Sequence, residues 1–135
     1  MIRLCLDENM NRKLASSLRP VFRGISFTSV HEEGLLHEED IPLFRKLSER
    51  GVGGLVTLDR NQLHGEERQA LRDCGIHWIG LPHPDGRRYQ IHAQVISTVV
   101  SGIRTILDQG FDDGPHLYLM QRRSLADLDV TSEPL

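Results

Sequence analysis

The chain has 135 residues, of which 39% are apolar and 26% are charged, and its formal net charge at pH 7 is −3. This length and balance are typical of one globular domain and exclude a fibrous or largely disordered chain. The small net charge gives no global attraction to a polyanion, so nucleic-acid binding would require local basic patches or a bridging metal ion. The two cysteines stand in unrelated contexts, which predicts unpaired thiols in a reducing compartment.

The first predicted element is a buried strand over residues 2–6, an apolar run that stops abruptly at Asp7. Because this run leaves no space for the regions of a signal peptide, and no later run is long enough to span a bilayer, we expect a cytoplasmic protein without a membrane partner. A short amphipathic helix is expected over residues 11–18, closed by Pro20. A second strand, rich in β-branched residues, is expected over residues 25–30.

A polar segment over residues 31–40 then leads to a helix over residues 41–50. Pro42 suits the first turn of that helix, where its missing N–H costs nothing. The next strand is expected over residues 54–58, and it repeats the pattern of the first strand because it also stops at an aspartate, Asp59.

The second half continues the alternation. A helix over residues 65–74 precedes a strand over residues 76–81 and a turn-rich stretch over residues 82–88. The longest helix is expected over residues 89–108, where apolar residues are spaced for one buried stripe that serves as core or dimer interface. A last strand is expected over residues 116–120.

Strands that alternate with helices predict an α/β fold with a mostly parallel central sheet of four to five strands, helices on both faces and right-handed crossovers. We expect one domain over residues 1–123 and a weakly ordered acidic tail over residues 124–135.

Acidic residues are expected to meet at one edge of this sheet. In parallel sheets the chemistry lies beyond the carboxyl ends of the strands, where the sequence places Asp7 and Asp59, and Asp40 stands at a helix start. Carboxylates brought together repel one another, and a divalent cation offsets that repulsion. Mg²⁺ and Mn²⁺ prefer such oxygen ligands, so the sequence predicts a metal site.

Three motifs resemble those of the PIN-like nuclease superfamily, particularly compact members related to VapC-type toxins. Residues 6–9 (LDEN) are similar to the motif that supplies the first acidic ligand of that family. Residues 39–44 (EDIPLF) resemble its acidic helix start, and residues 55–61 (LVTLDRN) resemble its Thr-x-Asp strand end.

The resemblance implies a PIN-like three-layer sandwich and a metal-dependent endoribonuclease, the toxin of a bacterial toxin–antitoxin pair. It implies Mg²⁺ or Mn²⁺ as cofactor, RNA as substrate, a cognate antitoxin as partner, and a homodimer as a further assembly. The implied catalytic residues and metal ligands are Asp7, Asp40 and Asp59. Expected supporting residues are Glu8, Asn9, Thr57 and Asn61. Expected RNA contacts are Arg12, Lys13, Arg60, Arg87 and Arg88.

The chain departs from the family in one respect, because the helical glutamate of PIN nucleases has no clear counterpart. Any of four other acids could take its place, and no motif selects among them; they are Glu8, Glu32, Glu33 and Glu39. The departure favours an alternative, a catalytically degenerate PIN-like module that binds a partner.

Two further interpretations are open. An aspartate that stands alone before a helix, as Asp40 does, is more often an N-cap than a metal ligand, and Asp7 and Asp59 can likewise cap the turns that follow them. A phosphoacceptor receiver domain is disfavoured, because it needs a lysine after a late strand and the last lysine here is Lys46.

Overall fold

A computed structural model describes residues 1–111, 113–121 and 131–134. Five strands form one sheet in the order β2-β1-β3-β4-β5, and every neighbouring pair is parallel. The strands are β1 (Ile2–Leu6), β2 (Ile25–Ser29), β3 (Gly54–Thr57), β4 (His77–Gly80) and β5 (Leu117–Leu119). The predicted parallel α/β fold is confirmed.

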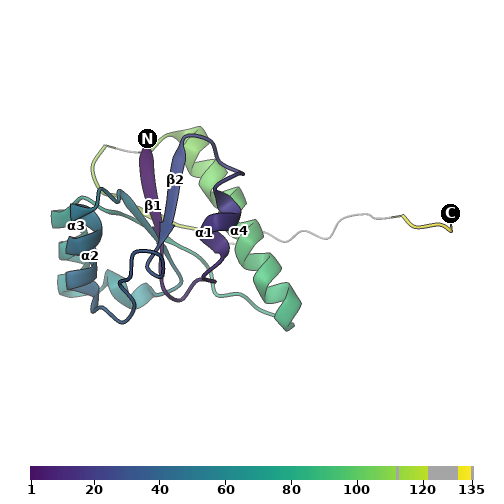
Figure 1. Cartoon of the computed structure of the whole chain (residues 1–135), viewed down its shortest axis with the longest axis horizontal. Coiled ribbons are helices and arrows are strands. Elements are labelled where there is room, and N and C mark those ends of the chain that lie inside the picture. The colour runs from purple at the N-terminus through teal and green to yellow at the C-terminus, as the bar shows by residue number, and fades with distance from the viewer. Residues whose placement is uncertain (112, 122–130, 135) are drawn as a thin grey trace.

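Helices cover both faces of this sheet. They are α1 (Leu14–Leu18), α2 (Asp40–Glu49), α3 (Gly65–Cys74) and α4 (Arg88–Gln109), with a 3₁₀ turn, η1 (Arg60–Leu63), between β3 and α3. Figure 1 shows α2 and α3 on one side of the sheet and α1 and α4 on the other. Side chains alternate along β1 accordingly: Leu4 and Leu6 join the apolar cluster under α1 and α4, whereas Cys5 joins the cluster under α2 and α3.

The crossover through α4 has a different hand from the two before it. The connections through α2, α3 and α4 all step across the sheet in the same direction, yet α4 packs on the opposite face. The expectation of uniformly right-handed crossovers therefore does not hold. The physical reason is that α1 has only five residues and covers little of the apolar sheet face on its side. The long helix α4 packs on the same face and covers the rest.

The first helix is shorter than the sequence predicts, and the longest helix is less buried. The first helix starts at Leu14 rather than at residue 11, because the Asn11 side chain accepts a hydrogen bond from the Lys13 backbone N–H at 2.8 Å and holds a turn there. In α4 the predicted stripe is only partly buried: Val99 and Ile103 are in the core, whereas Ile91 is 37% exposed. A helix of 22 residues is about 33 Å long and a five-residue strand about 17 Å, so the start of α4 projects past the sheet (Figure 1).

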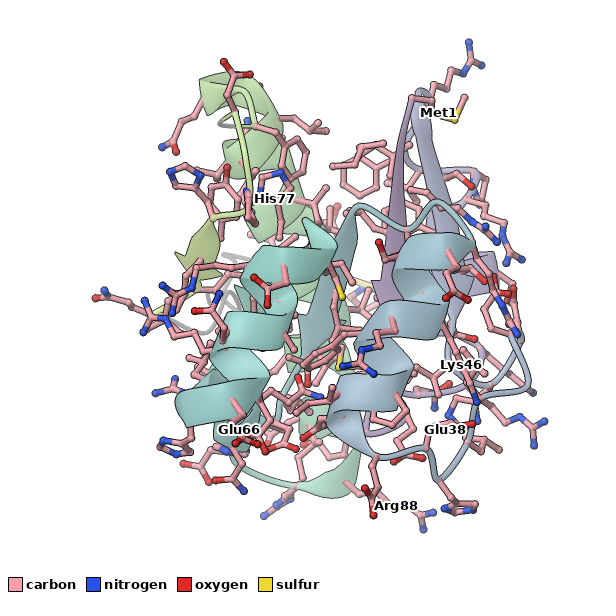
Figure 2. The ribbon with its side chains drawn as sticks, turned by 90° about the vertical axis from the view of Figure 1, so that its left-hand side faces the viewer. Met1, Glu38, Lys46, Glu66, His77 and Arg88 are labelled. Carbon is pink, nitrogen blue, oxygen red and sulfur yellow. The ribbon has the colours of Figure 1, made fainter. Side chains whose placement is uncertain are left out.

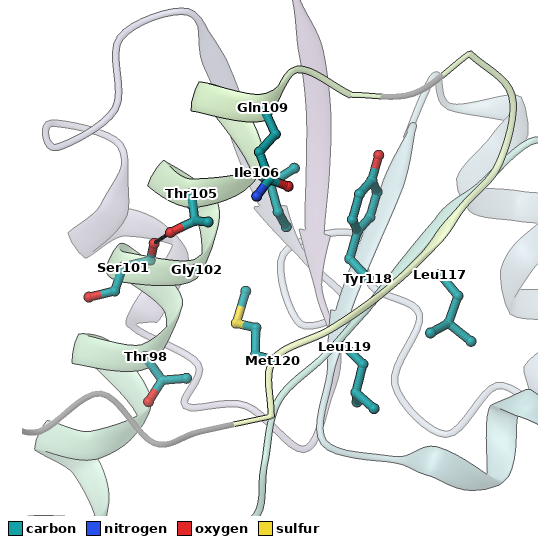
Figure 3. A pocket seen from close by; sticks show the side chains of 10 residues that line it. All are labelled: Thr98, Ser101, Gly102, Thr105, Ile106, Gln109, Leu117, Tyr118, Leu119 and Met120. Atoms are coloured by element: carbon teal, nitrogen blue, oxygen red, sulfur yellow. Dashed lines mark hydrogen bonds between the residues drawn. The ribbon is translucent and has the colours of Figure 1, made fainter.

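A pocket opens between α4 and β5 (Figure 3), and its described lining does not include Asp7, Asp40 or Asp59. Ile106, Tyr118 and Met120 line it together with uncharged polar side chains of α4. Among the described residues that line it, none is acidic, basic or histidine, so this lining does not form the predicted metal site.

Both cysteines are unpaired, as predicted. In the part of the chain that the structure describes, no helix has the length and apolar character needed to cross a bilayer. The division into a domain over residues 1–123 and an acidic tail stays a prediction, because residues 122–130 and 135 lie outside the described residues.

Candidate functional site at the carboxyl edge of the sheet

Asp7 lies at the end of β1, in the centre of the sheet. Its backbone N–H donates to the Val56 carbonyl at 2.9 Å and so continues the pairing with β3. The side chain is only 3% exposed. Its Oδ1 accepts from the Glu8 backbone N–H at 2.8 Å, and its Oδ2 accepts from the Thr57 hydroxyl at 2.7 Å and from the Gln62 amide at 2.9 Å. Asp7 is therefore a buried carboxylate whose position is fixed by three donors.

The Thr57 hydroxyl, at the end of β3, joins two of the predicted ligands. It donates to Asp7 and accepts from the Asp59 backbone N–H at 2.9 Å and from the Asn9 side-chain amide at 3.3 Å. The Asn9 carbonyl oxygen in turn accepts from the Leu58 backbone N–H at 3.3 Å. A hydroxyl that donates once and accepts twice has its full set of partners, so Thr57 ties the ends of β1 and β3 together.

Asp40 is connected to Asp7 through Gln62. The Gln62 amide nitrogen donates to Asp40 Oδ1 at 3.1 Å as well as to Asp7. Gln62 is 1% exposed, and its oxygen accepts from the Trp78 indole N–H at 3.3 Å. That bond decides the orientation of the amide, because an indole N–H can only donate. The amide nitrogen therefore faces the two carboxylates.

Trp78 reaches Gln62 because Gly80 gives it space. Both residues point to the same face of β4, two positions apart. A Cβ atom at position 80 would lie 2.2 Å from the Trp78 ring, which is closer than any real contact, so only glycine allows the ring to lie along the strand.

Negative charges converge on Asp40. Burial raises the pKa of its carboxyl above the ordinary value of 3.8, and the charges of Asp59, Asp7 and Glu67 raise it further, while the hydrogen bond from Gln62 opposes the rise. When a carboxyl binds its proton more tightly in the folded state than in the unfolded state, ionisation of that carboxyl lowers the free energy of unfolding of the protein. The arrangement at Asp40 thus carries an electrostatic cost that a cation would relieve.

We expect Asp40→Asn to stabilise the protein at neutral pH in the presence of EDTA. The folded state holds more protons than the unfolded state between pH 3.8 and the raised folded pKa, so wild-type stability falls as pH rises through that window. The variant lacks this loss and keeps an oxygen for Gln62. The gain should stay below about 1 kcal/mol, because Asp40 is partly exposed. Urea unfolding at pH 4 to 8 checks this, and a variant less stable than wild type at pH 7 would contradict it.

The helix-capping interpretations have different outcomes. The N-cap of α2 is Glu39, and Asp40 is the first helical residue, so the interpretation of Asp40 as a cap is wrong. Asp59 does cap η1, because its Oδ1 accepts from the Asn61 backbone N–H at 2.9 Å. The half-exposed Asp59 keeps its second oxygen for other partners.

The remaining predicted supporting and basic residues lie at the same end of the molecule. Glu8 is exposed, and its carboxylate accepts from the His37 backbone N–H at 3.1 Å. Each predicted RNA contact is exposed and follows the carboxyl end of β1, β3 or β4; they are Arg12, Lys13, Arg60, Arg87 and Arg88. Figure 2 shows Arg88 at the end of the molecule opposite to Met1. Among the described residues, none of the five is in an ion pair with an acidic side chain.

The structure brings a further acid to this edge. Glu67, in the first turn of α3, lines one pocket with Asp40 and Glu39 and contributes to the raised pKa of Asp40. Of the substitutes considered from the sequence, Glu32 forms an ion pair with Arg19, and Glu33 forms ion pairs with Arg3 and Arg50. Glu67 therefore joins Glu39 and Glu8 as a candidate for the fourth acidic position beside the three predicted ligands.

The chemistry of these donors fits a divalent cation, since Mg²⁺ and Mn²⁺ prefer carboxylate and amide oxygens. In the described ranges, however, no three acidic, histidine or cysteine side chains are close enough to share one ion. The Gln62 amide lies between Asp7 and Asp40 instead. The donor atoms of Asp7, Asp40 and Asp59 are of the kind that binds a divalent cation. An ion between Asp7 and Asp40 would have to displace the Gln62 amide.

Comparison with known proteins identifies the fold family. A family model described as a PIN like domain matches residues 2–83, more than half of the chain. The chain belongs to the PIN-like domain family. Searches of curated proteins and of solved structures returned no significant match. The matched part of this PIN-like domain ends just after β4 and contains Asp7, Asp40, Asp59 and Gln62. The family predicted from the motifs is confirmed, whereas the VapC-type branch stays a prediction.

Three functional candidates of this PIN-like domain were missed in the sequence. Gln62 lies in a four-residue segment that is too short to show a hydrophobic period, and η1 turns it inward. Trp78 reads as an ordinary strand residue. Glu67 reads as a solvated residue in the first turn of a helix, where acids are common. The neighbouring motif over residues 55–61 was the only local signal.

Proposed function

We propose that this PIN-like protein is a metal-dependent ribonuclease that acts at the carboxyl edge of its sheet. The observation that carries the proposal is the linked set of Asp7, Thr57, Gln62 and Asp40, with Asp59 joined to it through Thr57. Buried polar networks of this kind are costly unless they are complete, and they gather at functional sites. The family match supports nuclease chemistry at these residues.

The chain contributes position and charge to this chemistry. Asp7 is buried and accepts three hydrogen bonds, whereas Asp40 and Asp59 are half-exposed and can reach a bound ion. A divalent ion held by Asp7, Asp40 and Asp59 would supply the positive charge that polarises a phosphodiester and lowers the pKa of a water molecule. Arg60 and Arg88, with the other exposed basic residues of this edge, are available to hold the RNA phosphates on either side.

The proposal includes the role of toxin in a bacterial toxin–antitoxin pair of the VapC-type branch, in the cytoplasm. Such a toxin needs an antitoxin segment that covers the acidic edge. Two apolar side chains near this edge support a protein partner or a second copy, since Tyr89 is 69% exposed and Ile91 is 37% exposed at the start of α4.

The test is an RNA cleavage assay with Mn²⁺, Mg²⁺ or EDTA, run before and after any co-purified chain is removed. We expect cleavage only with metal, and a loss of at least about 100-fold in Asp59→Asn, since even residues that only support metal ligands change activity by 10- to 100-fold. Asp59→Asn keeps the oxygen that caps η1, so its fold should be unchanged.

The matched control is Asp73→Asn, in the last turn of α3, where the exposed Asp73 accepts a hydrogen bond from Gln69. It should cleave as the wild type does. A DNA strand of the same sequence tests the choice of substrate. If folded protein that is free of partners cleaves nothing in any metal, the nuclease proposal fails.

One observation favours a second candidate, the binding module. The Gln62 amide already donates a hydrogen bond to each of Asp7 and Asp40, so an uncharged group occupies the place between them that an ion would take. A protein without metal-dependent cleavage that still binds a partner through this edge would match that candidate.

A further inference from the structure

Gln62 lies where two carboxylates approach each other. Its amide nitrogen donates one hydrogen to Asp7 Oδ2 at 2.9 Å and one to Asp40 Oδ1 at 3.1 Å, and its side chain is 1% exposed. A primary amide has two such hydrogens, and both are used here. The amide therefore stabilises the pair of carboxylates in the way that a cation would, but without a charge.

The amide cannot exchange its ends in place. Its oxygen accepts from the Trp78 indole N–H at 3.3 Å, and Trp78 is 2% exposed. A flip would turn the Gln62 oxygen toward the Asp7 and Asp40 carboxylates and its nitrogen toward the indole N–H, so all three hydrogen bonds would be lost. An ion placed between Asp7 Oδ2 and Asp40 Oδ1 would therefore have to displace the amide nitrogen that lies there.

We propose that Gln62 competes with the divalent ion for Asp7 and Asp40, and so sets the metal concentration at which the site is loaded. The inference rests on the proposed metal site but not on ribonuclease activity. Withdrawal of the amide breaks its bonds to Asp7, Asp40 and Trp78, and this loss is subtracted from the free energy of metal binding.

The first test measures Mn²⁺ affinity by calorimetry. Gln62→Met has a similar length without a donor, and Gln62→Glu keeps an acceptor for Trp78 while it adds a carboxylate beside Asp7 and Asp40. We expect Mn²⁺ to bind both variants roughly 10- to 100-fold more tightly than the wild type, because the hydrogen bonds from the amide to the two carboxylates no longer have to be broken. Affinity that is unchanged or weaker in both variants would overturn the proposal.

Gln69→Met is the matched control, because Gln69 is exposed on α3 and donates to Asp73 instead. Its Mn²⁺ affinity should equal that of the wild type. A gain equal to that of Gln62→Met would show that loss of any glutamine raises affinity, and the proposal would fail.

The second test uses the wild-type protein and so does not depend on the folding of a variant. The chain has one tryptophan, so its ¹H–¹⁵N NMR spectrum has one indole N–H signal, which reports the bond from Trp78 to Gln62. During a Mg²⁺ titration this signal should move with the same midpoint as metal binding. A signal that stays in place at saturating Mg²⁺ would overturn the inference.

The outcomes separate this inference from the proposed function. Tighter Mn²⁺ binding by the Gln62 variants together with a moving indole signal supports the competition, even if the wild type cleaves no RNA. Metal-dependent cleavage with unaltered affinity in both variants supports the nuclease and refutes the competition. Absence of Mn²⁺ binding in the wild type and in both variants refutes the competition as well.

Discussion

Replacement of Asp7 by alanine is expected to lower the free energy of unfolding by about 3 kcal/mol, because hydrogen bonds to a charged group contribute about 1.5–3 kcal/mol each and their effects overlap. The substitution leaves the Thr57 hydroxyl, the Gln62 amide and the Glu8 backbone N–H without their acceptor in a buried place. The melting temperature should fall by roughly 10 °C. Thermal and urea unfolding, followed by Trp78 fluorescence, measure the loss.

Asp7→Asn is the matched variant. It keeps the shape and one acceptor oxygen, but its amide nitrogen must face either the Glu8 N–H or the donors of Thr57 and Gln62. Its stability should lie between those of the wild type and Asp7→Ala. If Asp7→Ala is as stable as the wild type, the burial of this carboxylate costs as much free energy as its hydrogen bonds contribute. That result would contradict the expectation that Asp7 stabilises the fold while Asp40 destabilises it.

Thr57→Val should cost about 2 kcal/mol and weaken metal binding by roughly 10- to 100-fold. Valine has nearly the same shape as threonine but no hydroxyl, so Asp7 loses a donor and the Asp59 backbone N–H and the Asn9 amide lose an acceptor. One substitution therefore loosens two predicted ligands that come from different strands. Urea unfolding and Mn²⁺ calorimetry give the two quantities.

Thr57→Ser separates the hydroxyl from the methyl group. It keeps every hydrogen bond and removes one buried methyl, so we expect a stability loss of about 1 kcal/mol and no change in metal affinity. If serine and valine weaken Mn²⁺ binding equally, packing at the end of β3 holds the ligands, and the hydroxyl does not.

The sequence was sufficient to predict the strands but not their arrangement. The apolar runs that end at Asp7 and Asp59 predicted β1 and β3 to within one residue, because a buried strand must stop where polar residues begin. The face on which α4 packs depends on the surface that α1 leaves uncovered, and strand order depends on pairing between distant parts of the chain. A local pattern contains neither kind of information.

Only those residues of the candidate site that belong to a sequence motif were predictable. The motifs selected Asp7, Asp40 and Asp59, and the structure brings them to one edge, although their role as ligands stays a prediction. Gln62 was not predictable, because its contacts join it to residues up to 55 positions away in the chain. A single short polar segment does not show such a partner.

The sheet order also determines which parts of the site can form while the chain is being made. β1 lies between β2 and β3 and leaves the ribosome before either, so the central strand has no partner until later residues appear. Once residue 62 has emerged, every residue of the network around Asp7 except Trp78 is outside the ribosome, whereas α4 has not yet emerged. The residues of the acidic edge thus emerge before α4, the helix that covers the apolar cluster under α1 and α4. The nascent chain exposes the apolar side chains of that cluster until α4 has emerged.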